Sequence, residues 1–231
     1  MRTTILLLAM AAALGAVPQD KAQDRPFTDT FLVDEKDFVT SGRNPYFVLE
    51  PGYQLVLENK QKKEVLVITV LDETKKIGGV ETRVIEEHES VDGQPKEISR
   101  NFFAICKRSN SVYYFGEEVD EYKDGKVVSH SGAWLHGEKG ARFGLMMPGL
   151  PLVGARYYQE VAPKVAMDRA EVLSVTDTFE TPAGKFDKVL TTEETTPLEP
   201  GERAHKKYAP GVGLLSDGDL KLVKYGLRAA K

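Results

Sequence analysis

The feature that most constrains this chain is the rhythm of short β-type runs across residues 44–226. Runs of β-branched and aromatic residues alternate, roughly every 8 to 12 residues, with Gly, Asp and Pro, which is typical of antiparallel sheets. Asp92-Gly93 and Asp124-Gly125 are strong signals for two-residue hairpin turns. No segment in this region has the period of an amphipathic helix over three turns. The pattern predicts an all-β domain of roughly eleven to thirteen strands, built as one large, curved antiparallel sheet, an open barrel or a sandwich.

The N-terminus has the order of residues found in a secretory signal. Arg2 supplies a positive charge, residues 5–14 form an apolar run, and small residues precede Pro18. The run is well short of the roughly 20 apolar residues that span a bilayer, so we expect no membrane span. We predict a signal peptide at residues 1–16 and a secreted or periplasmic protein. Because the single cysteine, Cys106, lies far from this leader, we expect no lipid anchor.

The rest of the chain divides into three parts. Residues 17–43 are polar and are interpreted as a tail or a short helix, residues 44–226 as the antiparallel β domain, and residues 227–231 as a C-terminal tail. A hydrophobic content of 41% is enough for a core, and a single cysteine excludes an internal disulfide. The 31 basic and 35 acidic residues are spread along the sequence, which excludes nucleic acid as an expected partner.

Several short motifs punctuate the β domain. They are Asn44-Pro45-Tyr46-Phe47, Tyr113-Tyr114-Phe115-Gly116-Glu117, Gly132-Ala133-Trp134, Pro182-Ala183-Gly184-x-Phe186 and Tyr208-Ala209-Pro210-Gly211-Val212-Gly213. With these motifs the chain resembles a family of uncharacterised secreted bacterial β-sheet proteins over nearly all of the β domain. It is also distantly similar to exported carrier-type half-barrel domains, in which a bent antiparallel sheet holds an apolar cleft. The resemblance implies a fold and a compartment, and it brings no established activity.

Motifs for catalysis are absent from the sequence. There is no nucleophile elbow, zinc-protease motif, phosphate-binding loop or dinucleotide fingerprint, so we expect no catalytic residue and no cofactor. His130 and His136 are candidate metal ligands, because imidazole together with the thioethers of Met146 and Met147 suits a soft metal. Methionines in an apolar stretch more often fill a core, however. The acidic run at residues 117–121 lacks the spacing of a calcium loop and is interpreted as a solvated hairpin face.

Residues 134–152 are rich in glycine and apolar side chains and show neither strand nor helix periodicity. A long irregular segment of this kind is usually functional or disordered. If exposed, it would offer a ligand or partner surface; if folded inward, it would plug the end of the sheet, which is the interpretation we favour. Together with the aromatic strand before it, this segment supplies the candidate ligand-binding residues Tyr113, Phe115, Trp134, Met146 and Met147.

Three hypotheses about function follow. The first, which we favour, is an exported, non-catalytic binding or carrier module of the cell envelope that takes an apolar small molecule or another envelope protein. The second is a secreted metal-dependent enzyme that uses His130, His136 and nearby acidic residues such as Glu117. The third is a structural envelope protein. The first requires a cavity of roughly a few hundred Å³ in the sheet, and the second requires carboxylate or sulfur ligands beside the histidines.

Overall fold

The computed structural model of the chain describes residues 25–228. The predicted signal peptide, residues 1–16, lies outside this part, as do residues 17–24 and 229–231. Within the described part the only helical segment is a 3-10 turn, η1 (Glu35–Asp37), and the all-β prediction is confirmed. No helix among residues 25–228 is long and apolar enough to cross a membrane.

A 16-stranded antiparallel sheet contains most of the strands, and β2 and β3 form a separate hairpin. The strands are β1 (Phe38–Val39), β2 (Gly42–Asn44), β3 (Phe47–Leu49), β4 (Tyr53–Asn59), β5 (Glu64–Ile77), β6 (Val80–Val91), β7 (Gln94–Cys106), β8 (Ser111–Lys123), β9 (Lys126–Ser129), β10 (Trp134–Leu135), β11 (Arg142–Met147), β12 (Arg156–Tyr158), β13 (Glu160–Val161), β14 (Arg169–Thr181), β15 (Gly184–Thr195), β16 (Ala204–Ala209), β17 (Gly213–Asp217) and β18 (Leu220–Leu227).

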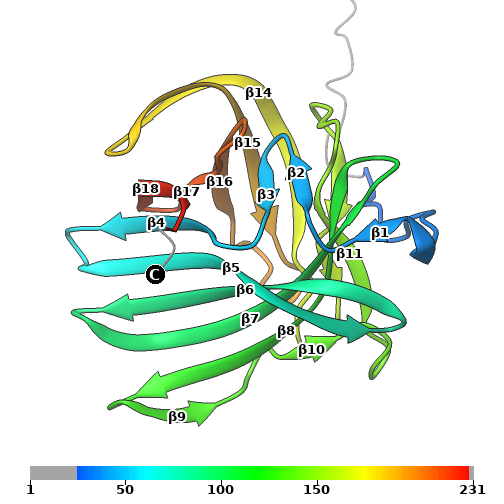
Figure 1. Cartoon of the computed structure of the whole chain (residues 1–231), viewed down its shortest axis with the longest axis horizontal. Helices are drawn as coiled ribbons and strands as arrows, with labels where there is room; N and C mark the ends of the chain where they lie inside the picture. Colours follow the sequence, from blue (N-terminus) through cyan, green and yellow to red (C-terminus); the bar gives the residue numbers. More distant parts are fainter. Residues whose placement is uncertain (1–24, 229–231) are drawn as a thin grey trace, which may run out of the picture.

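The sheet curls into a nearly closed barrel (Figure 1). Its main path runs β12-β14-β15-β16-β17-β18-β4-β5-β6-β7-β8-β11-β13. Both ends of this path belong to one short stretch of chain, because β12 and β13 are separated only by Gln159. β12 pairs with β14 and β13 pairs with β11, so this stretch draws the two edges of the sheet together.

The predicted hairpin turns form where the sequence places them. Asp92 and Gly93, between β6 and β7, have φ values of 52° and 75°. Asp124 and Gly125, between β8 and β9, have φ values of 53° and 73°. Asp tolerates this left-handed backbone and Gly adopts it without strain, which explains why these dipeptides turn the chain.

Gly144 allows the barrel to close for a different reason. A Cβ at this position would lie 2.3 Å from the carbonyl oxygen of Gln159, far inside van der Waals contact. β11 can therefore approach the segment between β12 and β13 only because residue 144 has no side chain.

Two apolar clusters lie on the two faces of the sheet, because side chains alternate along each strand. The inner cluster fills the barrel with side chains from around the sheet, among them Leu57, Val112, Leu190, Leu215 and Leu222. The outer cluster covers only β5 to β8 on the other face. Its main buried members are Val84, Phe102, Tyr113 and Phe115, and Phe31, Val33, Phe38 and Phe143 pack over them.

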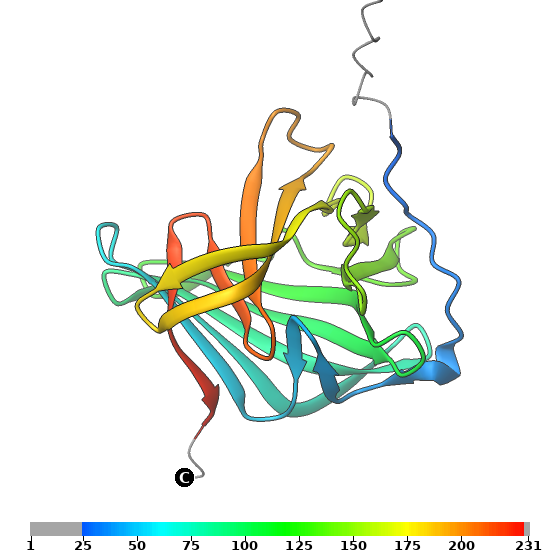
Figure 2. The ribbon, with the colours of Figure 1, turned by 90° about the horizontal axis from the view of Figure 1, so that it is seen from above.

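The segment before β2 runs along the outside of the barrel (Figure 2). It was predicted as a tail or a short helix, and in residues 25–43 it is extended except for η1. The backbone N–H of Thr28 donates to the Arg156 carbonyl oxygen over 2.9 Å, and the Tyr158 N–H donates to the Thr28 carbonyl oxygen over 2.8 Å. Phe38 in β1 lies opposite Cys106 of β7. The segment is thus fastened to two parts of the barrel wall.

The stretch at residues 134–152 contains more regular structure than its sequence suggests, namely β10 and β11. β11 pairs with β8, but the register shifts between Leu145 and Met147. Such a bulge interrupts the two-residue period, and this is why the pattern does not reveal the strand. Trp134 and Met147 are buried, whereas Leu150 is 76% exposed. The stretch is therefore a plug at its start and a surface loop at its end.

Candidate functional site

Two adjoining cavities lie inside the barrel. The apolar chamber, of about 90 Å³, is lined mainly by inner-cluster side chains such as Leu55, Leu66, Ile68, Val70, Ile85 and Leu214. The acid chamber, of about 200 Å³, is lined by polar side chains that include Glu87, Glu117, Glu160, Asp168, Glu194 and Lys206. The two chambers share the wall residues Glu87, Phe103, Met146 and Lys206.

Different strands direct these carboxyl groups inward. Glu87 of β6 follows Ile85 of the inner cluster by two residues, so alternation places it inside. Glu117 of β8 would face outward with Tyr113 and Phe115 if alternation continued. The register between β7 and β8 shifts just before it, where Gly116 pairs with Phe102, and Glu117 lines the chamber instead.

Lys206 is the only basic side chain that lines the acid chamber within residues 25–228. Its Nζ lies 3.0 Å from Oε2 of Glu194 and 3.4 Å from Oδ2 of Asp217. Gln159 Nε2 donates to the other oxygen of Glu194 over 3.1 Å. Burial alone would lower the pKa of Lys206, but these two carboxylates together hold it well above its ordinary value. The ammonium group of Lys206 is therefore neutralised by its own partners.

Four other carboxyl groups of the chamber, those of Glu87, Glu117, Glu160 and Asp168, form no ion pair with any residue in the described part of the chain. Burial, followed by the charge of Glu87, raises the pKa of Glu117 to about 8. Burial also raises the pKa of Glu87 to about 7. Burial and then Asp168 raise the pKa of Glu160 well above its usual range, although its Oε1 accepts a 2.6 Å hydrogen bond from the Asp168 N–H. At neutral pH Glu117 therefore mostly keeps its proton, and Glu87 is about half protonated.

Aromatic rings form a wall of the acid chamber near Glu117. The ring of Tyr114 stacks on Phe103 with centroids 4.6 Å apart and meets Trp134 edge to face at 5.2 Å. The Tyr114 hydroxyl donates to Oδ1 of Asn101. The Trp134 side chain is 6% exposed, and its Nε1 has no hydrogen-bond acceptor among residues 25–228. A buried donor without an acceptor is uncommon, so Nε1 of Trp134 is an unsatisfied polar group next to the chamber.

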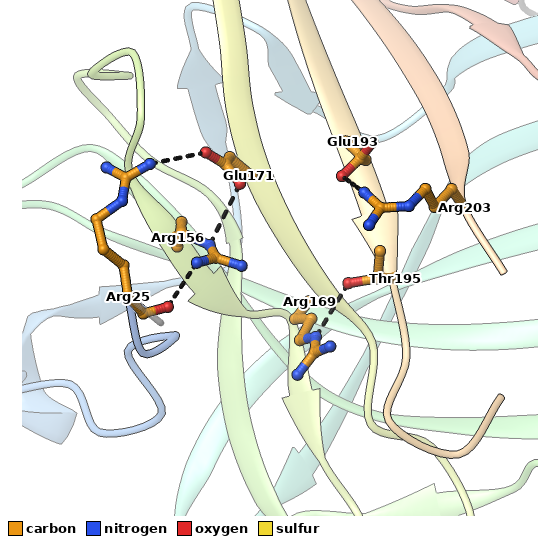
Figure 3. A network of polar contacts seen from close by, with 7 residues as sticks. All are labelled: Arg25, Arg156, Arg169, Glu171, Glu193, Thr195 and Arg203. Atoms are coloured by element: carbon orange, nitrogen blue, oxygen red, sulfur yellow. Dashed lines mark hydrogen bonds and ion pairs between the residues drawn. The ribbon is translucent and has the colours of Figure 1, made fainter. Parts of the chain in front are cut away.

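A network of arginines fastens the outside of the barrel where β12 meets β14 (Figure 3). Arg156 donates to the Arg25 carbonyl oxygen over 2.5 Å. Glu171 lies 3.3 Å from Arg25 and 3.2 Å from Arg156. The guanidinium groups of Arg156 and Arg169 lie 4.0 Å and 4.4 Å from the centre of the Phe27 ring. This network holds the N-terminal segment across the strands that close the acid chamber.

The predicted ligand-binding residues divide between the two faces of the sheet. Trp134 lines the acid chamber, and Met146 lines both chambers. Met147 is 1% exposed and packs in the inner cluster. Tyr113 and Phe115 belong to the outer cluster, away from both chambers. The structure thus brings together Trp134, Met146 and Met147 and separates them from the other two.

The two predicted metal ligands lie outside both chambers. His130 is 71% exposed, and its Nδ1 lies 2.8 Å from Oδ1 of Asp120. His136 packs edge-on against Phe143 in the outer cluster, and its Nδ1 accepts a 3.2 Å hydrogen bond from the Phe143 N–H. Burial lowers the pKa of His136. No group of three or more His, Cys, Asp and Glu side chains suited to a metal ion occurs in residues 25–228.

Sequence reasoning missed most polar residues of the acid chamber. Glu193 and Glu194 are neighbours in β15 that point to opposite faces, since Glu193 pairs with Arg203 outside and Glu194 with Lys206 inside. The signal that could have found Glu87 is its two-residue spacing from Ile85, and Glu194 continues the alternation of the buried Leu190 and Thr192. Glu160 sits in a two-residue strand, and no such pattern exists there.

No protein-family model matches the chain, and neither a curated protein nor a solved structure is similar to it.

Proposed function

We propose that the protein is a binding or carrier module that takes a small ligand into the interior of the barrel. The observation that supports this is the pair of adjoining chambers, one apolar and one polar, inside a single sheet. Burying carboxyl groups costs free energy, and apolar side chains of matching volume would fill the space at lower cost. A concave space lined by apolar side chains together with a few converging polar groups is the usual form of a ligand site. From the N-terminal leader we propose in addition that the protein acts outside the cytoplasm.

The size of the chambers limits the ligand. An apolar cavity of about 150 Å³ is enough for benzene. The apolar chamber is about 90 Å³ and the acid chamber about 200 Å³, so together they suit a short amphipathic molecule rather than a long lipid chain. A ligand of this kind would place its apolar part beside Ile68 and Val70 and its polar part beside Glu87 and Glu117.

Binding of 1-hexanol, measured by calorimetry and by the rise in Tm, tests this proposal. A ligand that binds only the folded state raises Tm with its concentration. Ile68→Phe fills the apolar chamber and should weaken 1-hexanol binding at least about tenfold, which is a loss of roughly 1.4 kcal/mol. Val67→Phe is the matched control, because Val67 directly precedes Ile68 in β5 and lines neither chamber.

The control variant should bind 1-hexanol as the unmodified protein does. The proposal is wrong if the unmodified protein shows no binding at millimolar 1-hexanol. It is equally wrong if Ile68→Phe binds 1-hexanol as well as Val67→Phe does, because the alcohol would then lie on the surface.

A further inference from the structure

We propose that the ligand of these chambers is a small amphipathic amine. Its ammonium group lies at Glu117 and Glu87, a neighbouring oxygen accepts from Nε1 of Trp134, and a short alkyl chain enters the apolar chamber. This inference rests on the proposed function, because it names the chemistry of the ligand of the same site.

The charges in the acid chamber favour a ligand with a positive charge. Lys206 is already neutralised by Glu194 and Asp217, at 3.0 Å and 3.4 Å. The carboxyl groups of Glu87 and Glu117 line the same chamber without an ion-pair partner among the described residues. A buried carboxyl group is neutralised either by a proton or by a partner of opposite charge, and a ligand cation can replace the proton. An anionic ligand would meet only these carboxyl groups and a lysine that is already occupied.

The aromatic wall of the acid chamber also favours an ammonium group. Trp134 and Tyr114 line the chamber together with Glu117, with their rings 5.2 Å apart and edge to face. Ring faces attract an ammonium group, most strongly on Trp, and this attraction grows when the site excludes water. Carboxylates and aromatic rings around one space are therefore a combination that favours an organic cation.

The N–H group of Trp134 indicates that the ligand also has a hydrogen-bond acceptor. This donor is buried and has no acceptor in the described part of the chain, although the indole ring lines the chamber. An ammonium group cannot accept a hydrogen bond, so the ligand needs an acceptor atom beside its cation. An amino alcohol has both groups, and the shared wall at Phe103 and Met146 leads from them to the apolar chamber.

Calorimetry at pH 7 with four probes of equal chain length tests this inference. We expect 2-amino-1-hexanol to bind most tightly, then hexylamine, at least about tenfold more tightly than 1-hexanol, and hexanoate least. Because burial raises the pKa of Glu117 to about 8, the amines should also displace a proton. Their heats should therefore change with the ionisation enthalpy of the buffer, and the heat of 1-hexanol should not.

Two variants assign the contacts. Glu117→Gln should weaken the amines at least about tenfold but 1-hexanol by no more than about twofold, because Gln loses the charge and keeps a hydrogen-bonding partner for a hydroxyl group. Circular dichroism reports separately that the variant is folded. Glu118→Gln is the matched control, since Glu118 is the next residue of β8 and pairs outside with Lys75. Trp134→Phe should remove the preference for 2-amino-1-hexanol over hexylamine.

Each remaining outcome contradicts one statement. If 1-hexanol or hexanoate binds as tightly as hexylamine, the preference for a cationic ligand is wrong, but the proposed binding function still stands. Undiminished amine binding in Glu117→Gln overturns the placement of the ammonium group. If Trp134→Phe still prefers 2-amino-1-hexanol over hexylamine, the hydrogen bond from Trp134 to the ligand oxygen is wrong. Absence of binding for all four probes overturns the proposed function as well.

Discussion

The two faces of β8 show how one strand can take part in two unlike environments. On the outer face, Phe115 lies 5.1 Å from Phe38 and 5.0 Å from Phe143 between ring centroids, and the cluster is apolar and filled. On the inner face, Tyr114 and Glu117 border space that is polar and incompletely filled. We propose that the outer cluster contributes stability, whereas the acid chamber lowers stability and serves ligand binding. The following variants test this division of roles.

The largest effect should come from the outer cluster. Phe115→Ala removes a fully buried ring and should lower the free energy of unfolding by about 3–5 kcal/mol. Urea unfolding measures this loss. The affinity for 1-hexanol, measured where the variant is folded, should stay within about twofold of the original. A lost affinity would show that the two faces are not independent.

The ion pairs of Lys206 should have the next largest effect. Lys206→Met leaves Glu194 and Asp217 without their cation and should cost about 2–3 kcal/mol, less than a fully buried pair because Lys206 is 24% exposed. Adding Glu194→Gln to Lys206→Met should recover part of the loss in urea unfolding. A double variant less stable than Lys206→Met would contradict the pairing.

Stability should also depend on pH through the acid chamber. The pKa values of Glu87 and Glu117 rise from 4.5 to about 7 and about 8 on folding. The folded state therefore binds more protons than the unfolded state between about pH 4.5 and 8, and stability falls as pH rises through this window. The groups that face Glu117 are Glu87 from β6, Glu97 and Ser99 from β7, and Tyr114 from β8 itself.

The expected loss between pH 5 and 8.5 is on the order of 2 kcal/mol, since each pKa unit is worth about 1.4 kcal/mol and chamber solvent screens part of it. Glu117→Gln stays uncharged at every pH and should flatten the curve of Tm against pH. Glu118→Gln, on the outside of the same strand, should leave the slope as it was.

Trp134→Phe should have the smallest effect on stability. Nε1 of Trp134 forms no hydrogen bond with the described residues, so the change removes none and should cost about 1 kcal/mol. A loss as large as that of Phe115→Ala, measured in the same urea titration, would mean that the chamber wall is as important to packing as the outer cluster.

The sequence predicts the fold well because the fold depends on local signals. The Asp-Gly turns are confirmed in the structure, and the side chains of β4 alternate between buried and half-buried. The site is predicted only in part. Three large aromatic residues follow one another in β8, namely Tyr113, Tyr114 and Phe115, so their sequence does not show which of them faces the interior. In the structure Tyr113 and Phe115 face outward, where residues of the N-terminal segment cover them. Glu117 turns inward at a bulge that depends on the pairing of β7 with β8.

The joint between β18 and β4 affects the order in which the barrel forms. Leu222 pairs with Leu57 and Tyr225 with Leu55, although the partners are far apart along the chain. All other neighbours between β4 and β8 are successive hairpins, which form early because their loops are short. A nascent chain can thus assemble this wall, but its β4 edge stays unpaired until β18 has been synthesised. Until then the open edge exposes backbone groups that can pair with another chain, so the β17–β18 hairpin protects the β4–β5 hairpin.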